Sequence, residues 1–311
     1  MSITTNASTT ATSVASGRPA VEPGLYVPAR TSRGLWRDAW RRLLRNKLAM
    51  GGLVVIGFMV LIALLADVLP LPDPTFQYPA SSYARPSVAH ILGNDQLGRD
   101  LLSRLVHGAR VSLAVAVFAQ VIILGVGLTV GGMAGYFGGR IDNWLMRFTD
   151  VFYAFPDLLF VIIITAALGA SLTNIFLAIG LVTWTDLARL VRGQLLTLRE
   201  RDFVSAARSL GAPAPRIIIN HLLPNAAGPV IVRLTYGIPQ AIFTEAVLSF
   251  IGLGVRPPQA SWGTMIQEGN QAIFSAPHLV LFPAIAIALT MLAFNFLGDG
   301  MRDALDPQNT R

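Results

Sequence analysis

The chain contains no cysteine, one lysine and four histidines among its 311 residues. Without cysteine it forms no disulfide and offers neither a thiolate metal site nor a cysteine nucleophile. Leucine follows the single lysine, Lys47, so the sequence lacks the Gly-x4-Gly-Lys-Ser/Thr loop that binds nucleotide phosphates. The histidines lie far apart and show no metal-ligand spacing: His90, His107, His221 and His278. We therefore expect a chain that is not an enzyme, with no catalytic residue, metal or cofactor of its own.

Charged residues are also scarce, at 13%, whereas 53% of the residues are hydrophobic. A helix needs roughly 20 apolar residues, rising about 1.5 Å each, to cross a bilayer. The sequence predicts an all-α membrane protein, which excludes a soluble enzyme. We expect six transmembrane helices, at about 48–69, 111–136, 148–169, 173–191, 228–250 and 279–298.

The formal net charge of +7 does not indicate a nucleic-acid partner, because the basic residues flank the apolar segments. If the N-terminus is inside the cell, 17 arginines and lysines beyond residue 32 fall on the inner side and 5 on the outer side. This asymmetry follows the positive-inside rule. We therefore expect a multi-pass membrane protein, surrounded by lipid, with both termini cytoplasmic.

The segments outside the spans differ in composition. Residues 1–32 are rich in serine, threonine and alanine, without the apolar core of a signal peptide, which predicts a disordered cytoplasmic tail. Residues 33–47 predict an amphipathic helix with two tryptophans and a basic face, lying in the headgroup plane or packed on a partner. The expected organisation is this helix with the first span (33–69), an extracytoplasmic loop (70–110), a core of five spans (111–300) with a cytoplasmic loop at 192–227, and a cytoplasmic C-terminal tail (301–311).

Glycines repeat at every fourth position of the second expected span, at Gly127, Gly131 and Gly135. Small residues at this spacing share one helical face and allow a second helix to approach closely. The repeat predicts tight packing within a bundle and indicates no chemistry.

A polar and basic segment, Glu200–Leu234, lies between two apolar stretches. Asp202 is placed to cap a helix over Phe203–Leu210, and Gly211 is suited to the left-handed conformation that ends one. Proline at 213 and 215 prevents continuation, and Pro215 is suited to open a second short helix.

An isolated two-turn helix is marginal in water, so we expect it to be held in the groove of a partner. Ala206 and Ala207 carry little side-chain bulk and allow a close approach, and Phe203 and Leu210 offer apolar anchors. The alternative is a solvated connector between two spans.

This loop resembles the "EAA" loop of type I ABC importer permeases, through the pattern Ser205-Ala206-Ala207-x3-Gly211-x9-His221-Leu222-Leu223-Pro224. The form His-Leu-Leu-Pro-Asn is similar to the dipeptide/oligopeptide importer family, and in particular to its second, C-type permease. Further segments agree with that family in order and spacing: 92–100 with 108–113, 245–254 with Pro257-Pro258 and Ser261-Trp262-Gly263, and 298–307. One departure is Ser205, which stands where the loop's first glutamate is usual. In the expected helix this position follows the cap by three residues, where a glutamate would complete a capping box. We expect its absence to cost the helix end at most about 1 kcal/mol.

The resemblance implies a MetI-like permease bundle that lies in the bacterial inner (plasma) membrane and forms half of a translocation pathway. It implies as partners a second, B-type permease, two ATPase subunits that carry ATP and Mg²⁺, and an extracytoplasmic substrate-binding protein. The implied cargo is a dipeptide or oligopeptide. By the same resemblance, the loop couples the chain to an ATPase through Asp202, Phe203, Ser205, Ala206, Ala207, Leu210, Gly211, His221, Leu223 and Pro224.

Two acids, Asp157 and Glu245, fall within or near apolar segments, where an ionised carboxylate costs roughly 2.5–3.5 kcal/mol. We expect each to line the translocation path or a gate, or else to be satisfied by an ion pair or a hydrogen bond at a helix end.

Permeases of nickel and glutathione importers share the sequence pattern and are alternatives. An ATP-independent secondary transporter and a channel subunit fit less well, because we find no internal repeat or filter-like loop.

Overall fold

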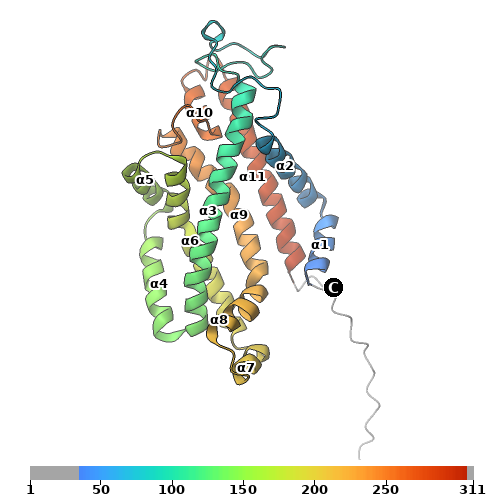
Figure 1. Cartoon of the computed structure of the whole chain (residues 1–311), viewed down its shortest axis with the longest axis vertical. Coiled ribbons are helices and arrows are strands. Elements are labelled where there is room, and N and C mark those ends of the chain that lie inside the picture. Colours follow the sequence, from blue (N-terminus) through green and yellow to red (C-terminus); the bar gives the residue numbers. More distant parts are fainter. Residues whose placement is uncertain (1–34, 307–311) are drawn as a thin grey trace, which may run out of the picture. The chain divides into compact units, whose positions relative to one another are not determined.

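The computed structural model describes residues 35–306, so the expected tail at 1–32 and the last five residues lie outside the described residues. Within that range the regular structure is helical, with no β-strand (Figure 1). The helices are α1 (Leu35–Arg45), α2 (Lys47–Leu64), η1 (Pro79–Ser81), α3 (Leu101–Phe137), α4 (Gly139–Tyr153), α5 (Asp157–Leu168), α6 (Leu172–Leu198), α7 (Asp202–Ser209), α8 (Ala214–Ile217), η2 (Ile218–Leu222), α9 (Leu223–Phe250), α10 (Trp262–Asn270) and α11 (His278–Leu305).

Polar side chains set where several of these helices begin. The Asn46 side chain accepts hydrogen bonds from two backbone N–H groups in the first turn of α2, both at 3.1 Å. Asp100 caps α3 by accepting from the backbone N–H of Ser103 at 2.8 Å, and Ser171 caps α6 in the same way. Each cap satisfies a backbone donor that has no partner within its helix.

Five helices are long and apolar enough to cross a membrane: α2, α3, α6, α11 and the continuous run Ala214–Phe250, in which α8, the π-helical turn η2 and α9 follow one another. The expected third span at 148–169 is wrong as a single helix. It is the pair α4 and α5, bent by 81° at a short break. The break has a local cause, because Pro156 disfavours helical geometry at the residue before it and itself becomes the cap of α5.

The centre of the bundle is the contact between α3 and α6, and it uses the glycine repeat as expected. A Cβ atom on Gly127 would lie 2.9 Å from the Leu187 side chain, and one on Gly135 would lie 2.7 Å from that of Leu195. A Cβ atom on Gly131 would collide with the backbone carbonyl of Ala188. The two helix backbones therefore approach as closely as glycine allows.

The connecting segments gather at opposite ends of the bundle. In Figure 1 the loop between α2 and α3 lies with α10 at one end, and α7 lies with the α3–α4 turn at the other. The first group contains the segments predicted to be outside the cell, and the second contains segments predicted to be inside. The grouping agrees with the prediction, while the side of the membrane that each group faces stays a prediction.

Helix α1 is amphipathic and packs on the end of α11. Ala39 and Leu43 are buried against Ala304 and Ala49, whereas Trp40 is 54% exposed. An exposed tryptophan beside arginines suits the headgroup region of a bilayer, which is where the sequence pattern places this helix.

The glycine contact makes a direct prediction about stability. Gly131→Val should destabilise the protein by about 1–3 kcal/mol, because the added side chain forces α3 away from α6. Gly125→Val is the matched control on the same helix, since no atom lies within 4 Å of a Cβ atom at that position. Thermal unfolding of the two purified variants in detergent checks the prediction. Equal melting temperatures would show that the close approach of α3 and α6 carries no stability.

Candidate functional site

The short helix expected in the polar loop is present as α7, and it ends as the sequence predicts. Gly211 has a φ of +78°, and its N–H donates to the carbonyl of Arg208 at 2.9 Å. The N–H of Ala212 donates to the carbonyl of Ala207 at 3.1 Å. These two bonds form a Schellman motif, in which a left-handed residue closes the last turn of a helix.

The expected start of this helix is wrong by one residue. Arg201 has the extended backbone of a cap but makes no side-chain capping bond, and Asp202 is the first helical residue. Asp202 therefore acts through its charge, which is favourable at the positive end of the helix dipole. The shift moves Ser205 beyond the position of a capping box, so a glutamate there is not needed to cap α7.

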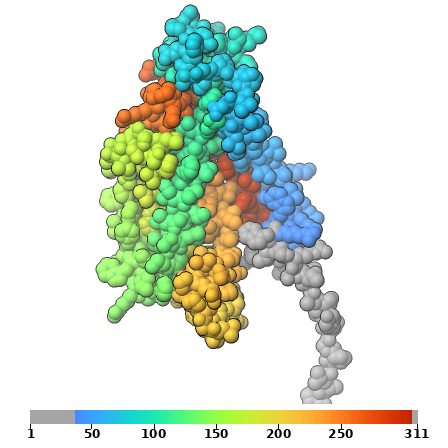
Figure 2. Space-filling model, viewed as in Figure 1, coloured from blue at the N-terminus to red at the C-terminus, as the bar shows by residue number. Residues whose placement is uncertain are grey.

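The helix has a buried face and an exposed face. Val204 is fully buried, and Ala207 is half-buried beside it. Phe203, Ala206 and Leu210 are exposed on the other face, and Leu210 is 87% exposed. The exposed set follows the spacing of one helical face, so α7 presents an uncovered apolar strip. Figure 2 shows the α7 segment as a projection at one end of the molecule.

The buried face fastens α7 to the bundle. Val204 belongs to a cluster with Leu195 of α6, Ile217 of α8 and Leu222 of η2, all of them fully buried. The Arg208 guanidinium also lies 5.4 Å from the ring centre of Tyr136 near the end of α3. These contacts connect α7 to α3, to α6 and to the helical run that continues into α9.

The other loop residues singled out in the sequence lie where α8 passes into α9. His221 is half-buried in the π-helical turn, and its carbonyl accepts a hydrogen bond from the Asn225 side chain at 2.6 Å. Leu223 is half-buried, and Pro224 is exposed at the start of α9, directly after the π-helical turn, where proline has no N–H to donate to the preceding turn. These residues shape the return of the chain to the membrane and stand apart from the exposed strip of α7.

The two acids have different surroundings. Glu245 is fully buried, and its carboxylate accepts hydrogen bonds from Ser249 at 2.7 Å and from Ser112 at 3.3 Å. The Ser112 hydroxyl also accepts from the backbone N–H of Trp262, so this cluster joins α3, α9 and α10. Glu245 is therefore satisfied by hydrogen bonds, and in this conformation it presents no surface to a passing solute.

Asp157 is exposed at the first turn of α5, beside the break in the bent pair. No described residue donates a hydrogen bond to its carboxylate, but Asp186 of α6 and Arg233 of α9 lie within electrostatic range. These two residues pair with each other at 2.9 Å. Neither member of this pair was among the predicted site residues, although each is a charge inside an expected span.

A buried ionic network joins the outer loop to α10. Arg104 contacts both Asp95 and Glu268, the latter at 2.6 Å, and Arg99 contacts the same two acids at 2.6 and 2.8 Å. Arg104 is 2% exposed. The network was not predictable, because Glu268 is far from the arginines in sequence and only the folded chain brings them together.

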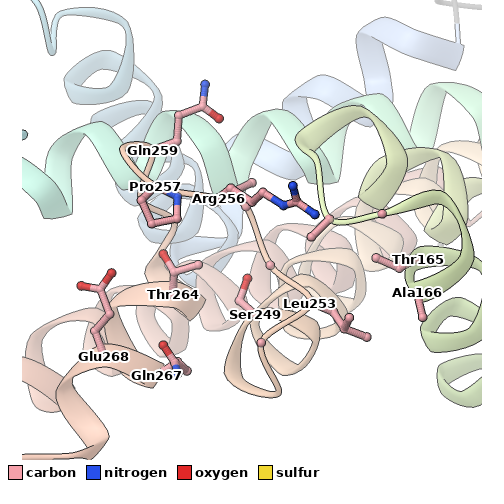
Figure 3. A pocket seen from close by; sticks show the side chains of 15 residues that line it. Thr165, Ala166, Ser249, Leu253, Arg256, Pro257, Gln259, Thr264, Gln267 and Glu268 are labelled. Atoms are coloured by element: carbon pink, nitrogen blue, oxygen red, sulfur yellow. The ribbon is translucent and has the colours of Figure 1, made fainter.

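A cavity of about 450 Å³ lies beside this network (Figure 3). It is lined by the α5–α6 connection, the loop after α9 and α10. Figure 3 shows the Arg256 side chain extending toward Thr165 and Ala166, with Glu268 on the opposite side. Arg256 therefore adds a positive charge to a cavity at the same end of the bundle as the buried network.

The sequence matches two family models. Residues 127–311 match the binding-protein-dependent transport system inner membrane component, and residues 34–86 match the N-terminal TM domain of oligopeptide transport permease C. The dipeptide transport system permease protein DppC of Bacillus subtilis (strain 168) is 44% identical over 91% of this chain and 88% of its own length. The oligopeptide transport system permease protein OppC of the same organism is 42% identical, over 90% of this chain and 92% of its own length.

A third relative has a different named cargo. The glutathione transport system permease protein GsiD of Pectobacterium atrosepticum is 41% identical over 88% of this chain and 91% of its own length. Among solved structures, an inward-facing form of the MetNI methionine ABC transporter is similar in fold. The similarity has a TM-score of 0.52 and 18% identity, and it covers 66% of this chain and 98% of the matched chain.

The buried network predicts a large effect of one substitution. Arg104→Ala should destabilise the protein by about 3–5 kcal/mol, because two largely buried carboxylates would then share a single arginine. Arg85→Ala removes an exposed arginine from the same outer segment and should change stability by less than about 0.5 kcal/mol. Thermal unfolding in detergent compares the two variants. A similar small effect for both would mean that the network does not hold α10 in place.

Proposed function

Because the chain belongs to the family of binding-protein-dependent transport system inner membrane components, within its dipeptide and oligopeptide permease branch, we propose that it carries short peptides across the bacterial inner membrane. The chain is the permease of an ABC importer, and it works with a substrate-binding protein and an ATPase. We assign it half of the pathway, with a B-type permease as the other half and two ATPase subunits below.

The single observation that carries the mechanism is the exposed apolar strip of α7. Phe203, Ala206 and Leu210 are uncovered in the chain alone, while Val204 ties the same helix to the bundle. A short helix with one buried apolar face and a second, exposed apolar strip is stabilised when a partner covers that strip. The proposed partner is the ATPase, which grips α7 from the cytoplasm.

The proposed cycle follows from this geometry. ATP closes the ATPase pair and moves the gripped helix α7, and the buried Val204 cluster passes the movement to α6 and α9. The bundle then rocks between two packings, as packed cores switch between discrete arrangements. ATP and Mg²⁺ act on the partner, because this sequence has no phosphate-binding loop.

The opposite end of the bundle receives the cargo in this proposal. The outer loop and α10 are locked together by the Arg104 network, which gives the binding protein a rigid surface. We propose the orientation in which α7, the basic residues near it and both termini are cytoplasmic, because the positive-inside rule favours it.

Glutathione is the strongest alternative cargo, since a glutathione permease is nearly as similar as the peptide permeases. Nickel is a second alternative that rests on the sequence pattern alone. Identifying the ligand on the co-purifying binding protein separates these cargoes, and uptake that does not need ATP would favour a secondary transporter.

Substitution at the tip of α7 tests the coupling. Leu210→Asp should weaken ATPase binding at least about 30-fold, since an interface anchor is worth roughly 2 kcal/mol or more. The melting temperature of the purified chain should not change, because Leu210 is 87% exposed in it. Co-purification of the ATPase and ATP-driven uptake in proteoliposomes are the measurements.

Two further variants control the experiment. Asn220→Asp adds the same charge at another exposed position of the loop and should leave coupling intact. Val204→Asp should lower the melting temperature of the chain itself, because it buries a charge in the cluster. Normal uptake by Leu210→Asp would contradict the proposed grip on α7.

A further inference from the structure

Three charged side chains from three helices lie close enough to influence one another electrostatically. Arg233 of α9 donates a hydrogen bond to the Asp186 carboxylate of α6 at 2.9 Å. Asp157, at the start of α5, is within electrostatic range of both and accepts no hydrogen bond from any described residue. The group therefore contains one cation, one paired acid and one acid with a free carboxylate.

Asp186 and Arg233 lie near the middle of their spans, where exposure of a charged side chain to lipid is unfavourable. Asp186 lies near the midpoint of α6, and Arg233 lies near the midpoint of the helical run Ala214–Phe250. Asp186 is 48% exposed and Arg233 is 32% exposed on their side chains. Charges inside membrane spans face a water-filled cavity or a protein partner, because contact with lipid is unfavourable.

A polar stripe connects this group to the α7 end of the bundle. Along α6, exposed or partly exposed Asp186, Arg189, Gly193 and Thr197 recur at helical spacing. Arg189 pairs with Asp150 of α4 at 2.7 Å, which keeps the stripe polar. A stripe of this kind is what the wall of an aqueous vestibule requires, and it reaches the end that holds α7.

The backbone beside Asp157 supports the same conclusion. The bent pair α4 and α5 breaks directly before this residue, with an angle of 81° between the helices. Irregular backbone within a membrane is tolerated where it is buried in protein or lines a water-filled cavity. Broken helices often mark the site where a transporter holds its solute.

We propose that this face is the water-lined wall of the translocation route and that it holds the two ends of a zwitterionic peptide as it passes. Arg233 receives the peptide carboxylate, Asp157 receives the peptide ammonium group, and Asp186 orients the Arg233 guanidinium. The inference rests on the proposed function and assigns a cargo site to the permease.

Other charged pairs in the bundle are not suited to this role. Arg192 binds Asp142 through two hydrogen bonds, at 2.5 and 2.6 Å, so both charges are used within the chain. Glu245 is fully buried among serines. The Asp157 group alone combines a free carboxylate with a partly exposed guanidinium among the in-span charges that the structure describes.

Cysteine labelling tests whether water reaches this face. The chain has no cysteine of its own, so Asp186→Cys and Gly193→Cys each introduce a unique thiol, and a Cβ atom on Gly193 meets no atom within 4 Å. Leu181→Cys is the control on the same helix, 43% exposed but on a different face. A charged, membrane-impermeant thiosulfonate is added to the assembled complex, and the mass of this chain is measured.

We expect both face variants to react at least about tenfold faster than Leu181→Cys, because only a water-lined wall supplies thiolate and reagent together. Failure of both variants to react, with and without ATP, while the Gly193→Cys complex still imports peptide, would mean that the face is packed against the second permease. That result would overturn the inference while leaving the proposed function intact.

Charge exchange separates cargo binding from a structural ion pair. Arg233→Gln and Asp157→Asn should each lower uptake of a free dipeptide by about tenfold, the effect of one lost charge-assisted hydrogen bond. The exchange of Asp186→Arg with Arg233→Asp keeps an ion pair between α6 and α9 but moves the cation. We expect the exchanged chain to assemble with its partners and still to transport poorly.

Restored uptake in the exchanged chain would show that the pair serves only to join two helices, and it would overturn the cargo role. Absence of ATP-dependent peptide uptake by the unchanged complex would instead overturn the proposed function. In that case thiol labelling still decides whether the face is lined by water.

Discussion

The position of α7 depends on one contact, the packing of the buried Val204 side chain against the bundle. Helix α7 is only two turns long, and a helix of that length does not persist in water without packing. Val204 inserts into a fully buried cluster with side chains from α6, α8 and η2, and this contact packs α7 against the bundle. The opposite face of α7 stays uncovered. A helix that is anchored on one face and open on the other can take up a force and pass it inward.

The polar groups inside the bundle fall into two kinds. Glu245, Ser112 and Ser249 satisfy one another in the core, and Arg192 and Asp142 neutralise one another between α6 and α4. These groups hold helices together and leave nothing for a ligand. The group around Asp157 differs, because Asp157 is exposed and its carboxylate accepts no hydrogen bond from a described residue. The contrast is the basis on which we propose that the Asp157 group meets water or cargo.

Much of this architecture follows from local sequence signals. The glycine repeat predicts the α3–α6 contact because small side chains permit a close approach wherever they face another helix. Gly211 predicts the end of α7 because few other residues adopt a positive φ. The start of α7 and the break at Pro156 were missed, since helix ends depend on which backbone groups find partners. The ion pairs Arg104–Glu268 and Arg233–Asp186 could not be predicted from the sequence, because contacts between distant segments form only once the helices have packed.

The most direct test of the central claim is photo-crosslinking from the exposed face of α7 in a complex that is importing substrate. A photoreactive residue at position 203 reports on that face, and one at position 54, exposed on α2, serves as the control. The account predicts that the probe at 203 attaches to an ATPase subunit and that the probe at 54 does not. Active transport with no attachment of the ATPase to position 203 or its neighbours on α7 would contradict the account.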